Sequence, residues 1–298
     1  MIAVRDRFGL IDEAQVEKDW YVVKALAAIM AAEKGPFQLV FQGGTALSRA
    51  HRIIQRMSED IDIKIVSEGK PSRNALRRLR KSITAELLKA GFSFDPENED
   101  FRRTNYEGRY TEYRLPYDAI TKGQGVLRPE LFIETSAFAA RRPPIECKLI
   151  SYLAEAYEKP AEIPAIACTS ITETAAEKFV ALTRRAGAEL AGVTRDPDPT
   201  LVRHIYDLHV IREHYDPHEV AELARDVMAA DAESRGKEFP AYGADPLGET
   251  LRAVEGLAAG GNFSEFYDRL LRDLVYGDRC AYEAAIASVL VIAEHLKP

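Results

Sequence analysis

A glycine turn and two closely spaced aspartates are the residues of this chain best suited to chemistry. The turn is Gly43-Gly44-Thr45, and Asp60 and Asp62 follow it after one helix-length. Backbone N–H groups at a glycine turn bind phosphate, and paired carboxylates bind divalent metal. Transfer of a phosphoryl-type group from a nucleotide needs both components. Each half alone is weak support, but the two in this order predict a nucleotidyltransferase.

The patterns around these residues predict the elements that position them. Residues 37–41 alternate as a short, mostly buried strand does, and Thr45 stands where the N-cap of a helix of roughly three turns belongs. In residues 61–65, isoleucines alternate with polar residues, so both aspartates share the face that points away from the core. An ordinary turn and a solvated strand edge are the alternatives for the separate pieces. The combination favours a phosphate and metal site.

A third acid is expected on a neighbouring strand, because two-metal transferases use one to complete their octahedral sites. Glu134 is the candidate, since it is an acid within the otherwise apolar strand predicted around residues 131–135. A strand-edge glutamate that faces water is the alternative. These acids predict Mg²⁺ as the cofactor, with Mn²⁺ as an alternative, and an NTP as the substrate.

Basic residues crowd the helix predicted over residues 72–90. They include Arg73, Arg77, Arg78 and Lys81. They could form the solvated face of an amphipathic helix. The alternative is a surface that binds RNA phosphates, which would make binding depend on salt.

The composition limits the class of protein. With 298 residues, 46% of them hydrophobic, the chain can form one large domain or two modest ones. The net charge of −7 argues against a protein that coats nucleic acid, so any nucleic-acid site must be local. The three cysteines lack metal-ligand spacing, so neither zinc nor a disulfide is expected. We expect a cytoplasmic protein with no membrane partner, because neither a signal-like start nor a membrane-spanning run is present.

The periodicities predict an α+β fold in two parts. Residues 1–156 form an α+β unit around a small mixed sheet, with strands over 109–115 and 130–138 and 148–156 as a further candidate. Residues 157–298 form a mainly helical domain, in which helical periodicity begins at residue 172. The connection is placed at residues 160–172.

Four segments occur in an order that resembles a known family. They are residues 43–47, 58–62, 173–178 and 203–208, and residues 17–20 resemble the family's amino-terminal helix. Together they resemble the nucleotidyltransferase toxins of the AbiEii/AbiGii abortive-infection family, which includes the mycobacterial MenT toxins. The first motif is shared with the wider DNA polymerase β-like nucleotidyltransferase superfamily. The resemblance covers roughly residues 12–215, and the last 80 residues carry no motif that we can place.

The resemblance implies a polymerase β-like core followed by a helical domain, with the active site in the cleft between them. It implies that residues 43–45 hold the triphosphate and that Asp60 and Asp62 hold Mg²⁺. Lys178 would neutralise triphosphate charge, although by itself it reads as an ordinary solvated lysine.

The resemblance also implies a required acid at Asp207, which activates the acceptor hydroxyl or positions Lys178. Read without the family, Asp207 is a boundary carboxylate that is paired structurally. Many relatives have Arg-Asp where this chain has Arg203-His204, so any role of that first aspartate is absent here.

The function implied is transfer of an NMP from an NTP to the 3′ end of tRNA, which blocks translation. Such an enzyme is the toxin of a type IV toxin–antitoxin system, with a separately encoded antitoxin. Transfer to a protein side chain and autophosphorylation are alternatives. A catalytically silent binding or regulatory relative is a further alternative, against which the intact Asp60 and Asp62 argue. A housekeeping tRNA-repair enzyme would lack Lys178 and Asp207 in these motifs.

Overall fold

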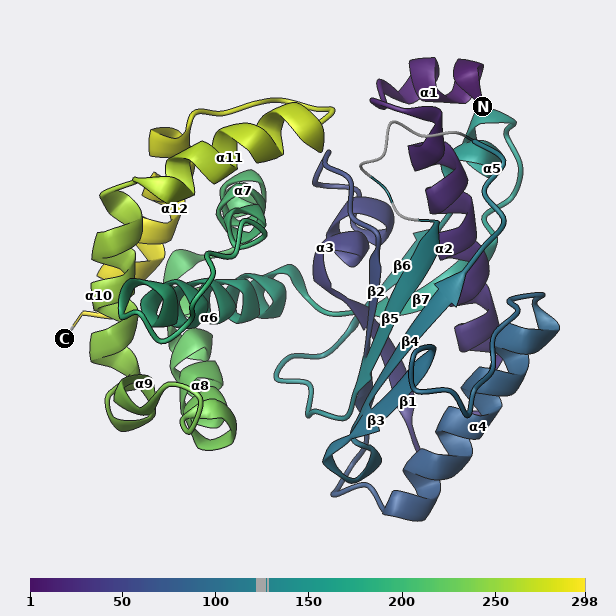
Figure 1. Ribbon diagram of the computed structural model, residues 1–298, viewed down its shortest axis with the longest axis horizontal. Coiled ribbons are helices and arrows are strands. Elements are labelled where there is room, and N and C mark those ends of the chain that lie inside the picture. The colour runs from purple at the N-terminus through teal and green to yellow at the C-terminus, as the bar shows by residue number, and fades with distance from the viewer. Residues whose placement is uncertain (122–126, 128, 298) are drawn as a thin grey trace. The chain divides into compact units, whose positions relative to one another are not determined.

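The computed structural model describes residues 1–121, 127 and 129–297, and it divides into two compact units (Figure 1). The units are Met1–Thr169 and Ser170–Pro298. The boundary therefore lies at Thr169 and not after residue 156. The reason is that residues 163–168, expected to be part of the connection, form a strand that completes the sheet of the first unit.

The first unit is built on a seven-stranded mixed sheet in the order β3-β4-β5-β2-β1-β7-β6. The pairs β1–β7 and β2–β5 are parallel, and the other neighbours are antiparallel. The strands are β1 (Gln38–Gln42), β2 (Asp60–Val66), β3 (Arg102–Asn105), β4 (Tyr110–Pro116), β5 (Glu130–Ser136), β6 (Ile145–Leu149) and β7 (Ile163–Cys168).

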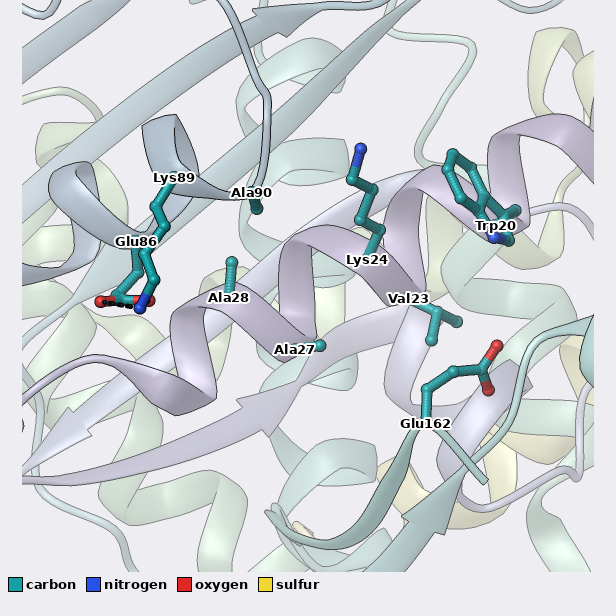
Figure 2. Close-up of a pocket in the computed structure, with 9 residues that line it drawn as sticks. All are labelled: Trp20, Val23, Lys24, Ala27, Ala28, Glu86, Lys89, Ala90 and Glu162. Atoms are coloured by element: carbon teal, nitrogen blue, oxygen red, sulfur yellow. Dashed lines mark hydrogen bonds and ion pairs between the residues drawn. The ribbon is translucent and has the colours of Figure 1, made fainter. Parts of the chain in front are cut away.

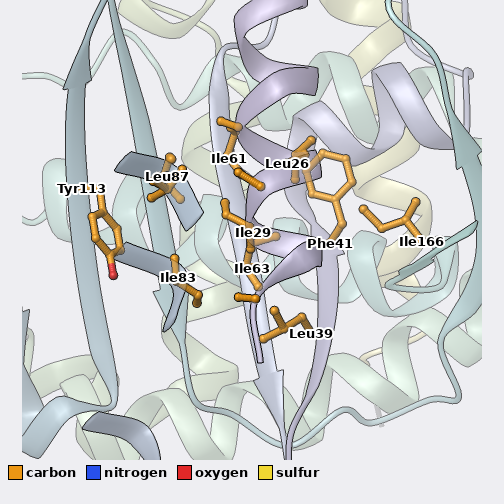
Figure 3. Close-up of a cluster of buried hydrophobic side chains, with 14 of the residues drawn as sticks. Leu26, Ile29, Leu39, Phe41, Ile61, Ile63, Ile83, Leu87, Tyr113 and Ile166 are labelled. Atoms are coloured by element: carbon orange, nitrogen blue, oxygen red, sulfur yellow. The ribbon is translucent and has the colours of Figure 1, made fainter. Parts of the chain in front are cut away.

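Two long helices, α2 and α4, cover one face of this sheet (Figure 1). Leu26 and Ile29 of α2 and Ile83 of α4 pack on Ile61 and Ile63 of β2 (Figure 3). Burying one such side chain stabilises a fold by about 1.5–3 kcal/mol, so this layer fixes β2 firmly. The helices of the unit are α1 (Ile2–Phe8), α2 (Glu13–Ala31), α3 (Gly43–Thr45), the π-helical η1 (Ala46–Ala50), α4 (Arg73–Lys89), the 3₁₀ turn η2 (Tyr106–Gly108) and α5 (Tyr152–Ala156).

The segment after the glycine turn differs from the prediction. The expected three-turn helix is only α3 and the single turn η1, and the chain then leaves the helix at Arg52, which has a φ of 60°. Thr45 is the last residue of α3 and not an N-cap, a position that Gln42 takes without a side-chain hydrogen bond. The candidate strand over 148–156 is wrong as well, because β6 ends at Leu149 and helix α5 follows.

The second unit is helical, as predicted. Ser170 caps its first helix by accepting a hydrogen bond from the Glu173 N–H at 3.2 Å. None of the described helices is long and apolar enough to cross a membrane. The elements are α6 (Ile171–Leu190), α7 (Val202–Val210), the 3₁₀ turn η3 (Arg212–His214), α8 (Pro217–Arg235), α9 (Pro240–Ala244), α10 (Pro246–Ala258), α11 (Asn262–Asp273) and α12 (Tyr282–Glu294).

Candidate active site

Four carboxylates share the polar face of three adjacent strands. The isoleucines of β2 are buried in the core, so Asp60 and Asp62 lie on its other face, as predicted. Asp62 pairs in register with Glu134 on β5, and Glu134 pairs with Glu112 on β4. Directly paired residues point to the same face of a sheet. We call Asp60, Asp62, Glu134 and Glu112 the carboxylate row.

The carboxylate row has the spacing and chemistry of a divalent-cation site. Neighbouring strands lie about 4.8 Å apart, so Asp62 and Glu134 can reach one cation or bridge two. Oxygen ligands of this kind suit Mg²⁺ and Mn²⁺. Strand β5 lies between β2 and β4, so Glu134 is not on an edge strand, in contrast to the alternative considered from the sequence.

Tyr110 holds Glu134 in place. Its hydroxyl donates a hydrogen bond of 2.5 Å to Glu134 Oε1. Burial of the phenol, followed by this hydrogen bond and by charges that include Asp62, raises the pKa of Tyr110 well above its usual value. The phenol therefore stays neutral and acts as a donor that orients Glu134 within the carboxylate row.

The glycine turn lies directly against the carboxylate row. Gly43 has a φ of 79°, and a Cβ on it would lie 2.3 Å from Asp62 Oδ2. A Cβ at that distance would force the Asp62 carboxylate to move, and L-residues rarely adopt that φ. Two features therefore favour glycine at position 43, and the turn brings backbone N–H groups next to a carboxylate of the row.

Thr45 fastens the turn to the start of β2. Its hydroxyl donates to the Asp60 carbonyl oxygen at 2.5 Å and lies 3.0 Å from Ser58 Oγ. A Cβ on Gly44 would lie 2.6 Å from Arg56 Nη2 and 2.8 Å from Ser58 Oγ. The structure thus brings together residues 43–45, Asp60 and Asp62, which the sequence grouped by order alone.

Two residues that we missed from the sequence belong to this site. Gln42 pairs with Asp62 across β1 and β2, and its Oε1 is buried and accepts no hydrogen bond from the described residues. Arg56 is only 3% exposed, and its guanidinium lies against Gly44 while donating to the Met57 carbonyl oxygen at 3.0 Å. The alternation of β1 could have found Gln42. No periodicity marks Arg56, because it lies outside any helix or strand that the patterns define.

Lys178 and Asp207 form a buried ion pair in the second unit. Lys178 Nζ on α6 lies 2.7 Å from Asp207 Oδ2 on α7, with side chains 8% and 0% exposed. Lys178 is therefore not the solvated lysine that the sequence of its helix alone suggested. Helices α11 and α12 pack against α7, the helix that carries Asp207, so the part of the chain without a recognised motif supports this helix. The contact supports the positioning role for Asp207.

The predicted RNA-binding residues lie on a different surface of the first unit. Arg73, Arg77, Arg78 and Lys81 are exposed on α4, whose buried side packs on the sheet face opposite the carboxylate row. Arg73 also forms an ion pair with Glu107. The structure does not bring these residues to the carboxylate row, and their role in RNA binding stays a prediction.

A surface pocket on the helical side is distinct from the candidate site. It is lined mainly by residues of α2 and α4, and the Glu86–Lys89 ion pair of 3.2 Å lies at one end (Figure 2). Trp20, of the family-like segment 17–20, borders this pocket. The sheet separates the pocket from the carboxylate row, so it is not the predicted nucleotide site.

A glycine turn set against a row of carboxylates on a mixed sheet fits the nucleotidyltransferase class of enzyme, which needs groups for phosphate and for divalent metal. The family model for the nucleotidyl transferase AbiEii toxin of type IV toxin–antitoxin systems matches residues 24–286. The chain belongs to this family, which confirms the predicted class of enzyme and the family resemblance. It is therefore a nucleotidyltransferase toxin of a type IV system.

A solved structure supports the fold. This chain is similar to the structure of MenT4, a nucleotidyltransferase toxin from Mycobacterium tuberculosis H37Rv, with a TM-score of 0.50 and 18% sequence identity. The match covers 78% of this chain and 72% of the MenT4 chain. This likeness confirms the α+β fold class. No curated protein matches the chain.

Proposed function

We propose that this toxin transfers an NMP from an NTP to the 3′ end of tRNA in the presence of Mg²⁺, and so blocks translation. The observation that carries the proposal is the contact of Gly43 with Asp62 inside the carboxylate row. It brings the glycine turn, which would bind phosphate, and the carboxylate row, which would bind a cation, to one point on one face of the sheet. Neither a structural turn nor a solvated strand edge requires that contact.

The residues of the row fit a divalent cation. Asp60, Asp62 and Glu134 would hold it, and the buried Gln42 Oε1, which lacks a hydrogen bond from the described residues, offers a further neutral oxygen. Bound there, Mg²⁺ supplies Lewis-acid polarisation of the α-phosphate. Tyr110 would keep Glu134 oriented toward the cation.

The chain's own groups then align the two reactants. The N–H groups of residues 43–45 would bind the triphosphate, and the Arg56 guanidinium beside Gly44 adds positive charge. The acceptor hydroxyl oxygen attacks the α-phosphorus, the bond to the bridging oxygen of the β-phosphate breaks, and pyrophosphate leaves. The hydroxyl proton passes to a carboxylate of the row. Most of the rate enhancement would come from alignment and charge stabilisation.

We also propose that Lys178 binds triphosphate charge and that Asp207 positions it. The 2.7 Å ion pair supports this division of roles, since a fully buried carboxylate paired with a lysine is poorly placed to accept a proton from an acceptor. The positioning role requires Asp207 to be a carboxylate, whereas Lys178 must be a cation.

The remaining parts of the proposal follow from the family. A type IV toxin implies a separately encoded antitoxin as a partner, and we place the protein in the cytoplasm, where NTPs and tRNA are found. The choice of tRNA as the acceptor derives from the resemblance to the MenT toxins, so the acceptor is the part of the proposal that most needs an experiment.

The test incubates the purified protein with Mg²⁺, each α-labelled NTP in turn, and total tRNA. Asp62→Asn removes a carboxylate of the row, and Asp100→Asn makes the same change at an exposed acid of the same unit. We expect label on tRNA with the wild type and Asp100→Asn, a loss of at least about 100-fold with Asp62→Asn, and no label on tRNA whose 3′ end was oxidised with periodate. Label on protein alone would reject tRNA as the acceptor. Label that survives in Asp62→Asn would reject the metal assignment.

A further inference from the structure

Three metal-ligating side chains converge at a place unrelated to the carboxylate row. One ring nitrogen of His51 and the sulfurs of Cys147 and Cys168 all lie within 4.8 Å of one another. Cys168 is fully buried, while His51 and Cys147 are half-buried, so two of the three side chains are partly accessible to solvent. We propose that these residues form a binding site for a thiophilic cation of the Zn²⁺ type.

The pairing of the strands explains why the two cysteines meet. Cys147 on β6 pairs with Ile166 on β7, and Cys168 lies two residues further along the same strand. Their side chains therefore share one face as diagonal neighbours. Cys168 also pairs with Phe41, a core residue of β1, so this face is the helix-covered one and is opposite the carboxylate row.

His51 joins them through the short helical segment after the glycine turn. Turn η1 ends at Ala50, and the imidazole of His51 then lies 3.0 Å from the carbonyl oxygen of Thr169 through Nε2. A carbonyl oxygen only accepts hydrogen bonds, so Nε2 donates in this contact, and in a neutral imidazole with that tautomer Nδ1 is the nitrogen whose lone pair can bind a cation. An outer hydrogen bond of this kind is what orients histidine ligands in metal sites.

The ligand types select the class of cation. Two thiolates and one imidazole are soft and borderline ligands, which prefer Zn²⁺ over Mg²⁺. Zn–S bonds of about 2.3 Å in a tetrahedral site require sulfur atoms about 3.8 Å apart. The three ligand atoms lie within 4.8 Å of one another, so side-chain rotations that bring them about 1 Å closer would give this spacing. The fourth position would be open to water or to another ligand.

The diagonal arrangement favours a cation over a disulfide. Diagonal neighbours on antiparallel strands have Cα atoms about 7–8 Å apart, whereas disulfides require about 4.4–6.8 Å. A bridging cation spans the longer gap. It would link β6, β7 and the segment that leaves the glycine turn, and so would stabilise the first unit. This inference does not depend on the proposed transfer reaction, and it revises the expectation from sequence spacing that the chain binds no zinc.

The test uses Co²⁺ as a spectroscopic probe on the whole chain after treatment with a chelator. Thiolate ligands give charge-transfer absorption in the near ultraviolet, and tetrahedral Co²⁺ gives intense visible bands. We expect both with the wild type at one equivalent, with loss of the bands when Zn²⁺ is added. Cys147→Ser removes a ligand, and Cys280→Ser makes the same change at a cysteine that contacts Tyr267 in the second unit.

Cys280→Ser should bind Co²⁺ as tightly as the wild type does. Cys147→Ser should bind Co²⁺ more than about 10-fold more weakly, because losing a direct ligand costs more affinity than losing an outer hydrogen-bond partner. A thermal melt of the cation-free proteins checks folding, and His51→Gln takes the place of Cys147→Ser if that variant does not fold. The inference is wrong if the wild type shows no thiolate bands, if the bands survive unchanged in the ligand variant, or if Cys280→Ser removes them. A mass lower by two hydrogens, from a Cys147–Cys168 disulfide in the purified protein, would also overturn it.

Discussion

Replacing Gly43 with alanine tests the contact between the glycine turn and the carboxylate row. The new Cβ would lie 2.3 Å from Asp62 Oδ2, and ordinary contact begins at 3.4 Å, so the oxygen must move by about 1.1 Å. A misplacement of about 1 Å at a reacting centre lowers a rate by about 100-fold. The φ of 79° adds a backbone penalty of about 1–2 kcal/mol to folding. We therefore expect Gly43→Ala to fold with slightly reduced stability and to lose about 100-fold in transfer rate.

Gly35→Ala is the matched control for this change. Gly35 has a φ of 56°, and a Cβ on it would meet nothing within 4 Å. It shares the backbone penalty but not the collision with Asp62. The assay compares initial rates of NMP transfer and the midpoints of urea unfolding for both variants. We expect similar losses of stability and a loss of rate only for Gly43→Ala. A Gly43→Ala enzyme that keeps a rate within about 3-fold of the wild type, or a Gly35→Ala enzyme that loses as much, would refute the reasoning.

Three further predictions concern other contacts. Asp207→Asn leaves the Lys178 ammonium buried without its counterion and should lower the free energy of unfolding by about 3–5 kcal/mol. In urea unfolding, the double variant that also carries Lys178→Met should regain more than half of the lost stability. Strictly additive losses of stability would contradict an energetic coupling between Lys178 and Asp207. Tyr110→Phe removes the donor to Glu134 and should lower the transfer rate by about 10- to 150-fold, because a hydrogen bond to a charged group is worth about 1.5–3 kcal/mol. An unchanged rate would show that this bond does not matter. Burial, followed by the charge of a nearby arginine, lowers the pKa of His209, so the unfolded chain takes up a proton first as the pH falls. Stability should therefore decrease below pH about 6.5, and His209→Gln should reduce this decrease in unfolding curves measured at successive pH values.

Local periodicity predicted the elements that have one face in the core and one face outside it. The alternation in 61–65 placed the isoleucines of β2 in the core and its aspartates outside, because the period of a strand permits nothing else. Strand β7 was missed because Ile163-Pro-Ala-Ile-Ala-Cys168 contains proline and alanine, which are poor strand formers. Its strand conformation comes from pairing with β1 and β6, which local sequence does not encode.

The candidate site was predictable in its residue types but not in its pairings. Glu134 could be proposed as an acid on a strand, yet its register opposite Asp62 depends on parallel pairing of segments about 70 residues apart. The same limit applies to the cysteines, which have no metal-ligand spacing in the chain and meet only through the register of β6 and β7. The N-cap position predicted for Thr45 was wrong: Thr45 ends α3, and its hydroxyl bonds the Asp60 carbonyl oxygen, a contact outside its own helix.

The fate of the phosphates during the reaction tests the central claim most directly. Parallel reactions with α-labelled and γ-labelled NTP, with the wild type and with Asp62→Asn, distinguish nucleotidyl transfer from phosphoryl transfer at the same site. The carboxylate row and the glycine turn predict that the wild type leaves α-label on the acceptor and releases γ-label as pyrophosphate. Asp62→Asn should do neither. Stable γ-label on the acceptor, or equal α-label from both proteins, would contradict the claim that this site transfers nucleotides.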